Sequence, residues 1–281
     1  MDDSDGAGSD PFQVILLATD GSEYSAGVER VGIEMASRHH AQLFILRLLL
    51  AEAGTDAAIV EEQDAALHLE RVTLQCTERE ISCTPMVRSC EEPSQGILAA
   101  AREVGAQLVI LGRRGRRGLA KLMVGEATAK VVDKSECSVL VVPRLFSYWN
   151  GGVLLVAEND QDERSSAPQT AFSLARATQL PLTVLMVTEG DESERRELNQ
   201  TVNRLVALAE LQQVPVTGLV QSGETDDVIL EVARQRSADI IVCEPRDRSV
   251  IDRLFQTNKL VHLIGRANCP VLVVHEAAVA S

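Results

Sequence analysis

The sequence predicts an α/β protein made of two tandem domains, each a doubly wound parallel sheet. The chain repeats its own apolar segments, and each repeated segment is apolar at nearly every position. Its length of 281 residues fits two domains of roughly 150 residues. Residues 14–18 match 153–157, and residues 43–46 match 182–185, both at an offset of 139 residues. Residues 137–142 match 269–274 at an offset of 132 residues.

The first repeat alternates predicted strands with predicted helices. Runs of consecutive apolar residues indicate strands that are buried on both faces, as in parallel sheets covered by helices on two sides. Aromatic residues make up only 3% of the chain, so the cores consist mainly of Val, Leu, Ile and Ala. We expect strands at 13–18, 43–50, 85–87, 108–111 and 139–142, and helices at 24–40, 57–80, 94–104 and 125–134.

The repeats set the expected domain boundaries. Residues 1–10 form an acidic tail, 11–145 the first domain and 153–281 the second domain. The linker at 146–152 holds the only Trp of the chain. Two interpretations of the linker stay open: a contact between the domains, or an apolar tether that lies on one of them.

Charge and composition exclude several classes of function. A net charge of −14 argues against binding to nucleic acid, which requires an excess of Lys and Arg. No apolar run approaches the roughly 18 residues that span a bilayer, so we expect no membrane insertion. The acidic N-terminus is unlike a secretory signal, and the six cysteines form no CxxC pair, so we expect a cytoplasmic protein. The five histidines show no metal-ligand spacing, and we assign no metal site.

A glycine-rich loop follows the fourth predicted strand. Gly112, Gly115 and Gly125 have the spacing G-x2-G-x9-G, and Gly125 falls where a helix begins. A helix N-terminus attracts phosphate, and glycine lets a ligand approach the backbone closely. The alternative is a solvated basic loop whose glycines only make turns. Five cations accompany the loop: Arg113, Arg114, Arg116, Arg117 and Lys121.

Together these motifs resemble the universal stress protein family. The segment 15–22 (ILLATDGS) resembles the first strand of the family, and 138–143 (SVLVVP) resembles its last strand. The glycine loop resembles the family's ATP-binding pattern, G-x2-G-x9-G-Ser/Thr. The resemblance covers 13–144 and 153–275. It implies an adenine nucleotide alpha hydrolase-like fold, stress-associated regulation and, in some members, nucleotide binding.

The resemblance also implies roles for individual residues. Asp20 matches the acidic residue that contacts the adenosine moiety, and a plain turn or helix cap is the alternative. Leu48 matches a position whose backbone meets adenine, and the three glycines match the phosphate-binding glycines. The implied ligand is ATP or another adenine nucleotide, with or without Mg²⁺. The full expected site is Ala18, Thr19, Asp20, Leu48, Leu111, Gly112, Arg113, Gly115, Gly125, Glu126, Ala127 and Thr128.

Glu126 departs from the family pattern, because it stands where that pattern has Ser or Thr. A carboxylate there repels phosphate, so AMP, ADP or a cyclic nucleotide loses less than ATP does. We expect the Thr128 hydroxyl to compensate in part. Another interpretation is that Glu126 holds a divalent cation that bridges to phosphate.

The second repeat has lost the pattern. Glu244, Asp247 and Thr257 replace its three glycines, and Asn159 replaces Asp20. We therefore interpret the second repeat as a structural or partner-binding half.

Three functions follow from these observations. The first is a regulatory protein that binds one adenine nucleotide in repeat one and acts on an unknown protein partner. The second is a scaffold without a ligand, and the third is a weak ATPase. No residue is placed as a nucleophile or base, so we assign no catalytic residue. The last strands, 138–143 and 270–274, are expected to pair edge to edge in an intramolecular pseudo-dimer. Dimerisation of the whole chain stays open.

Overall fold

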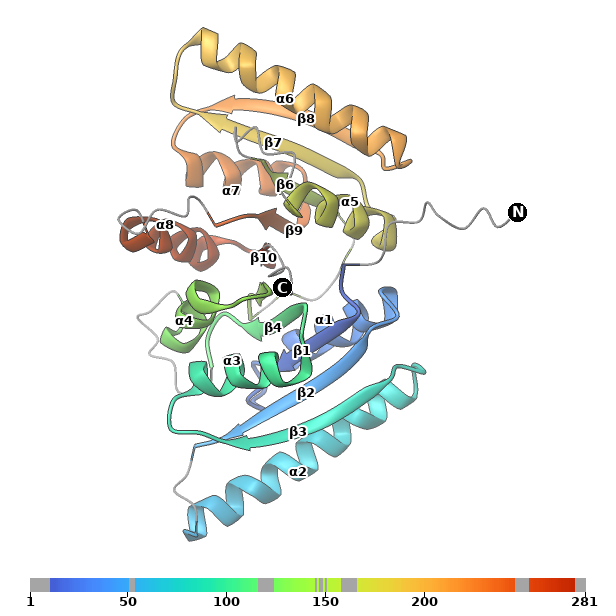
Figure 1. Ribbon diagram of the computed structural model, residues 1–281, viewed down its shortest axis with the longest axis vertical. Helices are drawn as coiled ribbons and strands as arrows, with labels where there is room; N and C mark the ends of the chain where they lie inside the picture. The colour runs from blue at the N-terminus through green and yellow to red at the C-terminus, as the bar shows by residue number, and fades with distance from the viewer. Residues whose placement is uncertain are drawn as a thin grey trace, which may run out of the picture.

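One mainly parallel ten-stranded sheet runs through both repeats of the computed structural model (Figure 1). The strand order is β3-β2-β1-β4-β5-β10-β9-β6-β7-β8, so each repeat has the same order around its own first strand. The structure describes 11–50, 54–115, 124–144, 146, 149, 151–157, 166–245 and 253–275, without the side chains of 253–258. The tail at 1–10 lies outside these residues.

The first repeat contains every strand and helix that the sequence predicts. β3 is longer than expected, since it pairs with β2 from Cys83 to Ser89. The elements are β1 (Val14–Ala18), α1 (Ala26–Arg38), β2 (Gln42–Leu49), α2 (Asp56–Thr77), β3 (Cys83–Ser89), α3 (Pro93–Val104), β4 (Leu108–Gly112), α4 (Glu126–Lys134) and β5 (Ser138–Val142).

The second repeat follows the same plan. Its first strand begins at Gly152, a residue that the sequence analysis assigned to the linker. The elements are β6 (Gly152–Val156), α5 (Ser166–Thr178), β7 (Leu182–Thr188), α6 (Glu192–Leu211), β8 (Val216–Ser222), α7 (Thr225–Gln235), β9 (Ala238–Cys243), α8 (Arg253–Arg266) and β10 (Val271–Val273).

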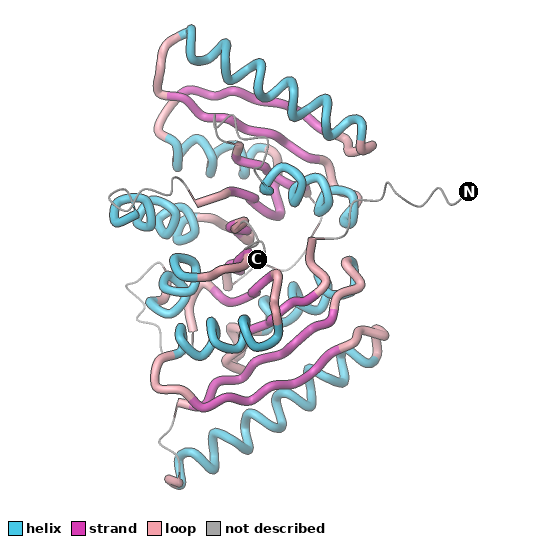
Figure 2. Tube along the Cα trace, in the orientation of Figure 1, coloured by secondary structure: helices cyan, strands magenta, loops and turns pink. Residues whose placement is uncertain are grey.

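The two repeats join where β5 meets β10. This is the antiparallel pair of the sheet, with Val271 opposite Val141, Leu272 opposite Leu140 and Val273 opposite Val139. The predicted edge-to-edge pairing of the last strands is therefore confirmed. Figure 2 shows the strands running through the middle of the molecule, with helices around them. Pairing at this seam covers an edge that each half-sheet would otherwise expose.

The strands are buried on both faces, as their composition predicts. Ile15, Leu16 and Leu17 of β1 have no exposed surface, although successive side chains point to opposite faces of a sheet. Helices must therefore cover both faces, which makes the fold doubly wound. None of the described helices is long and apolar enough to cross a membrane.

The first part of the linker packs on repeat one. A Cβ built on Gly27 of α1 would lie 3.1 Å from the Phe146 carbonyl oxygen, so the two backbones are close. The rings of Phe146 and Trp149 pack edge to face, with centroids 5.4 Å apart, and both side chains are nearly buried. These contacts favour the tether for this part of the linker. Ser147, Tyr148 and Asn150 lie outside the described residues.

Candidate functional site

The expected site lies where the strand order of repeat one changes direction. β1 pairs with β2 on one side and with β4 on the other, both in parallel, so the carboxyl ends of β1 and β4 lie side by side. Ligands of doubly wound sheets bind at such a switch point. The loops that leave these two ends, 19–22 and 112–115, are the two that the sequence analysis selected.

Asp20 closes its own turn and also faces the glycine loop. Its Oδ1 accepts hydrogen bonds from Ser22 N at 3.0 Å and Ser22 Oγ at 2.7 Å. A Cβ built on Gly115 would lie 3.6 Å from Asp20 Oδ2. Asp20 therefore braces its own turn, as the turn interpretation predicts, and its carboxylate also lies beside the glycine loop.

Ala18, Leu111 and Leu48 form the rest of this edge. Ala18 pairs with Leu111 of β4 and with Leu46 of β2, and Thr19 N donates to the Leu46 carbonyl oxygen at 3.1 Å. Leu48 is two residues further along β2, so its backbone extends past the end of β1. Its half-buried side chain lies close to Gly96 of α3.

Hydrogen bonds brace the described ends of the glycine loop. Gly125 N donates to the Arg113 carbonyl oxygen at 2.8 Å, and Arg113 N donates to that of Val142 at 2.9 Å. Gly112, Gly115 and Gly125 all have negative φ, so turn conformation is not what requires glycine there. Arg116, Arg117 and Lys121 lie outside the described residues.

Thr128 braces the same loop. Its buried hydroxyl donates to the Gly112 carbonyl oxygen at 2.9 Å, which ties α4 to the end of β4. The hydroxyl proton of Thr128 is therefore already engaged in a hydrogen bond within the protein. For Thr128 to donate to phosphate in place of the hydroxyl that Glu126 lacks, this bond would have to break.

Glu126 is the first residue of α4 and points to solvent, with a side chain 78% exposed. Lys130, one turn later, lies 2.9 Å from its carboxylate and 2.7 Å from that of Glu92. The hydrogen bonds that Lys130 donates to Glu92 and Glu126 raise its pKa. Lys130 therefore balances part of the charge of Glu126. Lys130 is not among the predicted site residues, although a Glu-Lys pair four residues apart on a helix signals such a contact.

Arg113 has a different role from the one expected. Its Nη1 donates to the carbonyl oxygens of Gly265 at 2.8 Å, Ala267 at 3.0 Å and Ile264 at 3.3 Å, at the end of α8. Carbonyl groups in the last turn of a helix lack intrahelical partners and carry partial negative charge, which explains the contact. The guanidinium of repeat one thus caps a helix of repeat two, and only the backbone of Arg113 lies in the loop.

A buried polar network lies behind the Asp20 turn. Glu29 of α1 is 2% exposed and accepts hydrogen bonds from Thr19 Oγ1 at 2.8 Å and Ser25 Oγ at 2.9 Å. From α2, His68 Nε2 lies 2.8 Å from Glu29 Oε1, and Arg71 Nη2 lies 3.1 Å from Oε2. Thr19 Oγ1 in turn accepts from Gly21 N at 3.3 Å. Glu29 therefore positions the turn that carries Asp20.

Arg47 completes this network under Gly21. A Cβ on Gly21, which has φ +68°, would lie 3.2 Å from both Arg47 Cζ and His68 Cγ. Arg47 Nη2 donates to Asp64 Oδ2 at 3.0 Å. The backbone of the Asp20 turn thus packs against two buried side chains, Arg47 and His68.

This network is not among the sequence-based predictions, although the sequence carries two signals of it. Arg47 interrupts an otherwise apolar strand, and Glu29 lies on the same helical face as the buried Ile33 and Ala36. At the offset of 139 residues, repeat two has Met186 in place of Arg47 and Pro168 in place of Glu29. These two charges therefore lie behind the retained turn only.

In the second repeat a glutamate side chain lies at the switch point. Glu244, the counterpart of Gly112, accepts a hydrogen bond from Ala167 N at 2.8 Å, in the first turn of α5. A carboxylate at the carboxyl end of β9 thus accepts a hydrogen bond from one backbone N–H in the first turn of α5. Asn159, Asp247 and the Thr257 side chain lie outside the described residues.

Comparison with known proteins identifies the family. The sequence model of the universal stress protein family matches the chain twice, at 11–143 and 152–275. The chain belongs to the universal stress protein family. Universal stress protein Sll1388 of Synechocystis is 30% identical to it over 147 residues, which cover 46% of this chain and 96% of the relative.

Solved structures share the fold of this universal stress protein. A putative universal stress protein from Pseudomonas aeruginosa matches with a TM-score of 0.75 at 19% identity, over 95% of this chain and 94% of its own. A universal stress protein solved in complex with cAMP also matches 48% of this chain and 99% of its own, with 23% identity, but its TM-score of 0.38 adds no argument about the fold.

The Glu29 network makes the stability of this universal stress protein depend on pH. Burial raises the pKa of Glu29, but hydrogen bonds from His68, Thr19 and Ser25 outweigh it and lower the pKa from 4.5 to about 2. Because the folded pKa is depressed, the ionised carboxylate stabilises the fold above pH 4.5, and this stabilisation is lost as the pH falls toward 2.

We predict that Glu29→Gln lowers the free energy of unfolding at pH 7 by about 3 kcal/mol. The difference between parent and variant should shrink as the pH falls below about 4.5, measured by urea unfolding at a series of pH values. Glu103→Gln is the control, because Glu103 is an exposed carboxylate paired with Arg88 and should matter little. A constant difference across the pH series would contradict the assignment.

Proposed function

We propose that repeat one binds one adenine nucleotide at the carboxyl ends of β1 and β4, and that the protein is a regulatory binding protein. The observation that carries the proposal is the approach of Gly115 to the Asp20 carboxylate at the switch point. The absence of a side chain at Gly115 leaves room beside Asp20 Oδ2. In this proposal the Asp20 carboxylate accepts a hydrogen bond from a ribose hydroxyl.

The start of α4 supplies the phosphate contacts in this proposal. Its N-cap is Gly125, which has no side chain to cap the helix. The backbone N–H groups of Glu126, Ala127 and Thr128 lie in the first turn of α4, where intrahelical acceptors are missing. They would donate to phosphate oxygens, helped by the helix dipole.

The site favours a nucleotide with few phosphates. The exposed Glu126 carboxylate lies at the start of α4, and Lys130 offsets its charge only in part because Lys130 also pairs with Glu92. Each additional phosphate increases the repulsion from Glu126. We therefore propose AMP or ADP ahead of ATP. Among the described residues no cluster of His, Cys, Asp and Glu is suited to hold a metal ion.

A regulatory role fits the position of Arg113. Its backbone belongs to the glycine loop, while its guanidinium caps α8 of repeat two. A nucleotide that shifts the glycine loop would change the hydrogen bonds between Arg113 and the end of α8. The conformation of repeat two would then depend on nucleotide binding, and no catalytic step would be needed. We propose that this response alters binding to a protein partner in the cytoplasm under stress.

A scaffold without a ligand is the second candidate function. It is favoured by the internal bonds of Gly125 N and of the Thr128 hydroxyl, which engage two groups that the family pattern offers to phosphate. The two candidates differ in one observable, which is saturable nucleotide binding by repeat one.

Gly115→Glu tests the location of the site. We predict that it weakens binding of AMP about 100-fold, because a second carboxylate would occupy the space beside Asp20. The melting temperature should stay close to that of the parent, since Gly115 is exposed and a Cβ there makes only ordinary contacts. Titration calorimetry and thermal unfolding measure the two effects.

The matched control for this test is Gly115→Ala, which adds the Cβ without the charge. Its loss of affinity should be much smaller than that of Gly115→Glu. Binding by Gly115→Glu at the level of the parent would place the nucleotide elsewhere.

Glu126→Ser tests the choice of nucleotide. We predict about tenfold tighter binding of ATP, because the variant removes a negative charge from the start of α4 and adds a hydroxyl donor. Binding of AMP should change less, since its single phosphate meets less repulsion. Competition against a fluorescent AMP analogue measures both affinities.

Glu136→Ser controls for the loss of one charge, because Glu136 lies just after the other end of α4 and pairs with Arg102. It should leave the affinity for ATP unchanged. An equal gain in ATP affinity for Glu136→Ser and Glu126→Ser would mean that net charge alone is responsible.

A further inference from the structure

Helix α2 carries an apolar stripe on its solvent face. Val60, Leu67 and Leu74 are 65%, 70% and 59% exposed, and Ile59 beside them is 53% exposed. These four are the majority of the large apolar side chains that are exposed in the described part of the chain. Figure 1 places α2 at one end of the molecule, away from the seam between the repeats.

The stripe has the geometry of a helix-pairing surface. Its three main residues are seven positions apart, the spacing of one position in a coiled-coil heptad. The residues that α2 buries against the sheet are Ala65, His68, Leu69, Val72 and Cys76, on the opposite side of the helix. Core packing therefore does not explain the stripe.

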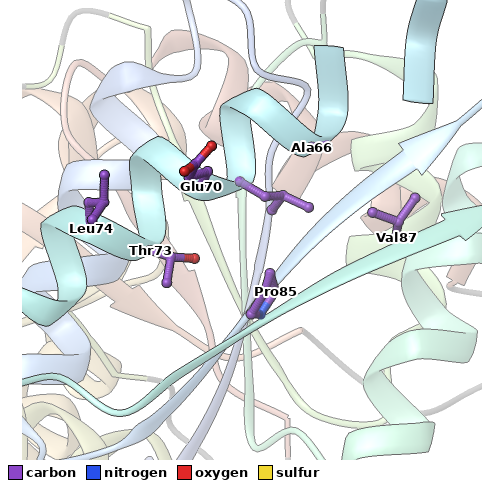
Figure 3. A pocket seen from close by; sticks show the side chains of 7 residues that line it. Ala66, Glu70, Thr73, Leu74, Pro85 and Val87 are labelled. Atoms are coloured by element: carbon purple, nitrogen blue, oxygen red, sulfur yellow. The ribbon is translucent and has the colours of Figure 1, made fainter. Parts of the chain in front are cut away.

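A groove extends the stripe toward the edge of the sheet. Leu74 borders a cavity of about 430 Å³ between α2 and β3, which is also lined by Ala66, Leu69, Glu70, Thr73, Pro85 and Val87. Figure 3 shows Thr73 and Leu74 on the helix, with Pro85 and Val87 on the neighbouring strand. The groove and the stripe share Leu74, so they adjoin, and Glu70 adds an acidic side chain to the wall of the groove.

The edge strand itself is protected against strand addition. β3 is the outer strand of the sheet and carries Pro85, which has no backbone N–H to donate. An incoming strand would meet an interrupted ladder. The apolar surface is therefore better suited to an incoming helix, which makes its contacts through side chains.

The charges of α2 indicate the charge that a partner helix should carry. The helix has five acidic residues and one strongly basic residue, Arg71, which is bound to Glu29. Asp64 pairs with Arg47, and Glu61 accepts a hydrogen bond from Leu50 N. The remaining acids, Asp56, Glu62 and Glu70, are exposed and make no ion pair within the described residues. By helical spacing Asp56 and Glu70 lie next to the stripe, so the stripe complements a helix with basic side chains beside its apolar face.

The same charges disfavour a second copy of this chain. Antiparallel pairing of two α2 helices about Leu67 would bring Glu70 of one copy close to Asp64 of the other. Parallel pairing would align identical acids, and the net charge of −14 adds further repulsion.

We infer that the stripe and groove of α2 form a docking surface for a basic amphipathic helix of a partner protein. The helix lies along α2 with its apolar face on Val60, Leu67 and Leu74, and its Lys or Arg side chains reach Asp56 and Glu70. This surface is separate from the proposed nucleotide site, so either one can fail a test without the other.

The test uses the full-length protein and a labelled synthetic peptide. The peptide has about three heptads with Leu at positions a and d and Lys at positions e and g. A second peptide has Glu in place of each Lys. Fluorescence anisotropy should show saturable binding of the Lys peptide, weakened by salt, and much weaker binding of the Glu peptide. No binding of the Lys peptide, or equal binding of both peptides, would overturn the inference.

Variants locate the peptide. Leu67→Lys should weaken binding about tenfold or more, and Glu70→Lys should weaken it and reduce its salt dependence. Leu211→Lys is the matched control, because Leu211 is 81% exposed on α6 at the other end of the molecule and should have no effect. Equal loss in Leu211→Lys, or none in Leu67→Lys, would contradict this surface. A parent dimer that Leu67→Lys converts to a monomer would show that a second copy occupies it.

Discussion

Three residue pairs between β5 and β10 connect the two halves of the molecule. Each half is a parallel sheet with the same strand order, and the antiparallel seam turns two edges into one continuous interior. The same seam lies near the end of β4, which brings the glycine loop of repeat one within reach of α8. Arg113 caps that helix because the seam fixes the distance between them. The regulatory proposal therefore depends on this strand pairing.

At their switch points the two repeats differ in buried charged residues as well as in the number of glycines. Repeat one buries Glu29, His68 and Arg47 behind the Asp20 turn, where isolated charges would be costly without partners. Repeat two has Met186 at the position of Arg47, and Glu244 caps α5 at its own switch point. Repeat one thus holds the Asp20 turn in place with a buried polar network and leaves space beside the turn. In repeat two the Glu244 carboxylate lies at the equivalent position.

The sequence predicts the fold well because its signals are local or periodic. Apolar runs such as Ile15–Leu17 indicate buried parallel strands, and the repeat at a fixed offset indicates two similar halves. Contacts of the site were harder to predict. The partner of Arg113 lies more than 150 residues away along the chain, and its side-chain direction depends on the packing of the halves. The Thr128 hydroxyl has a partner inside the loop, which spacing alone does not reveal.

The central claim is that one nucleotide binds per chain, in repeat one. Titration calorimetry of the nucleotide-stripped protein with AMP, ADP, ATP and cyclic AMP, with and without Mg²⁺, tests it most directly. We expect saturable binding at one site per chain, with AMP or ADP binding more tightly than ATP. Two sites per chain would contradict the asymmetry between the repeats. No binding by any of the four would contradict the nucleotide site and favour the scaffold.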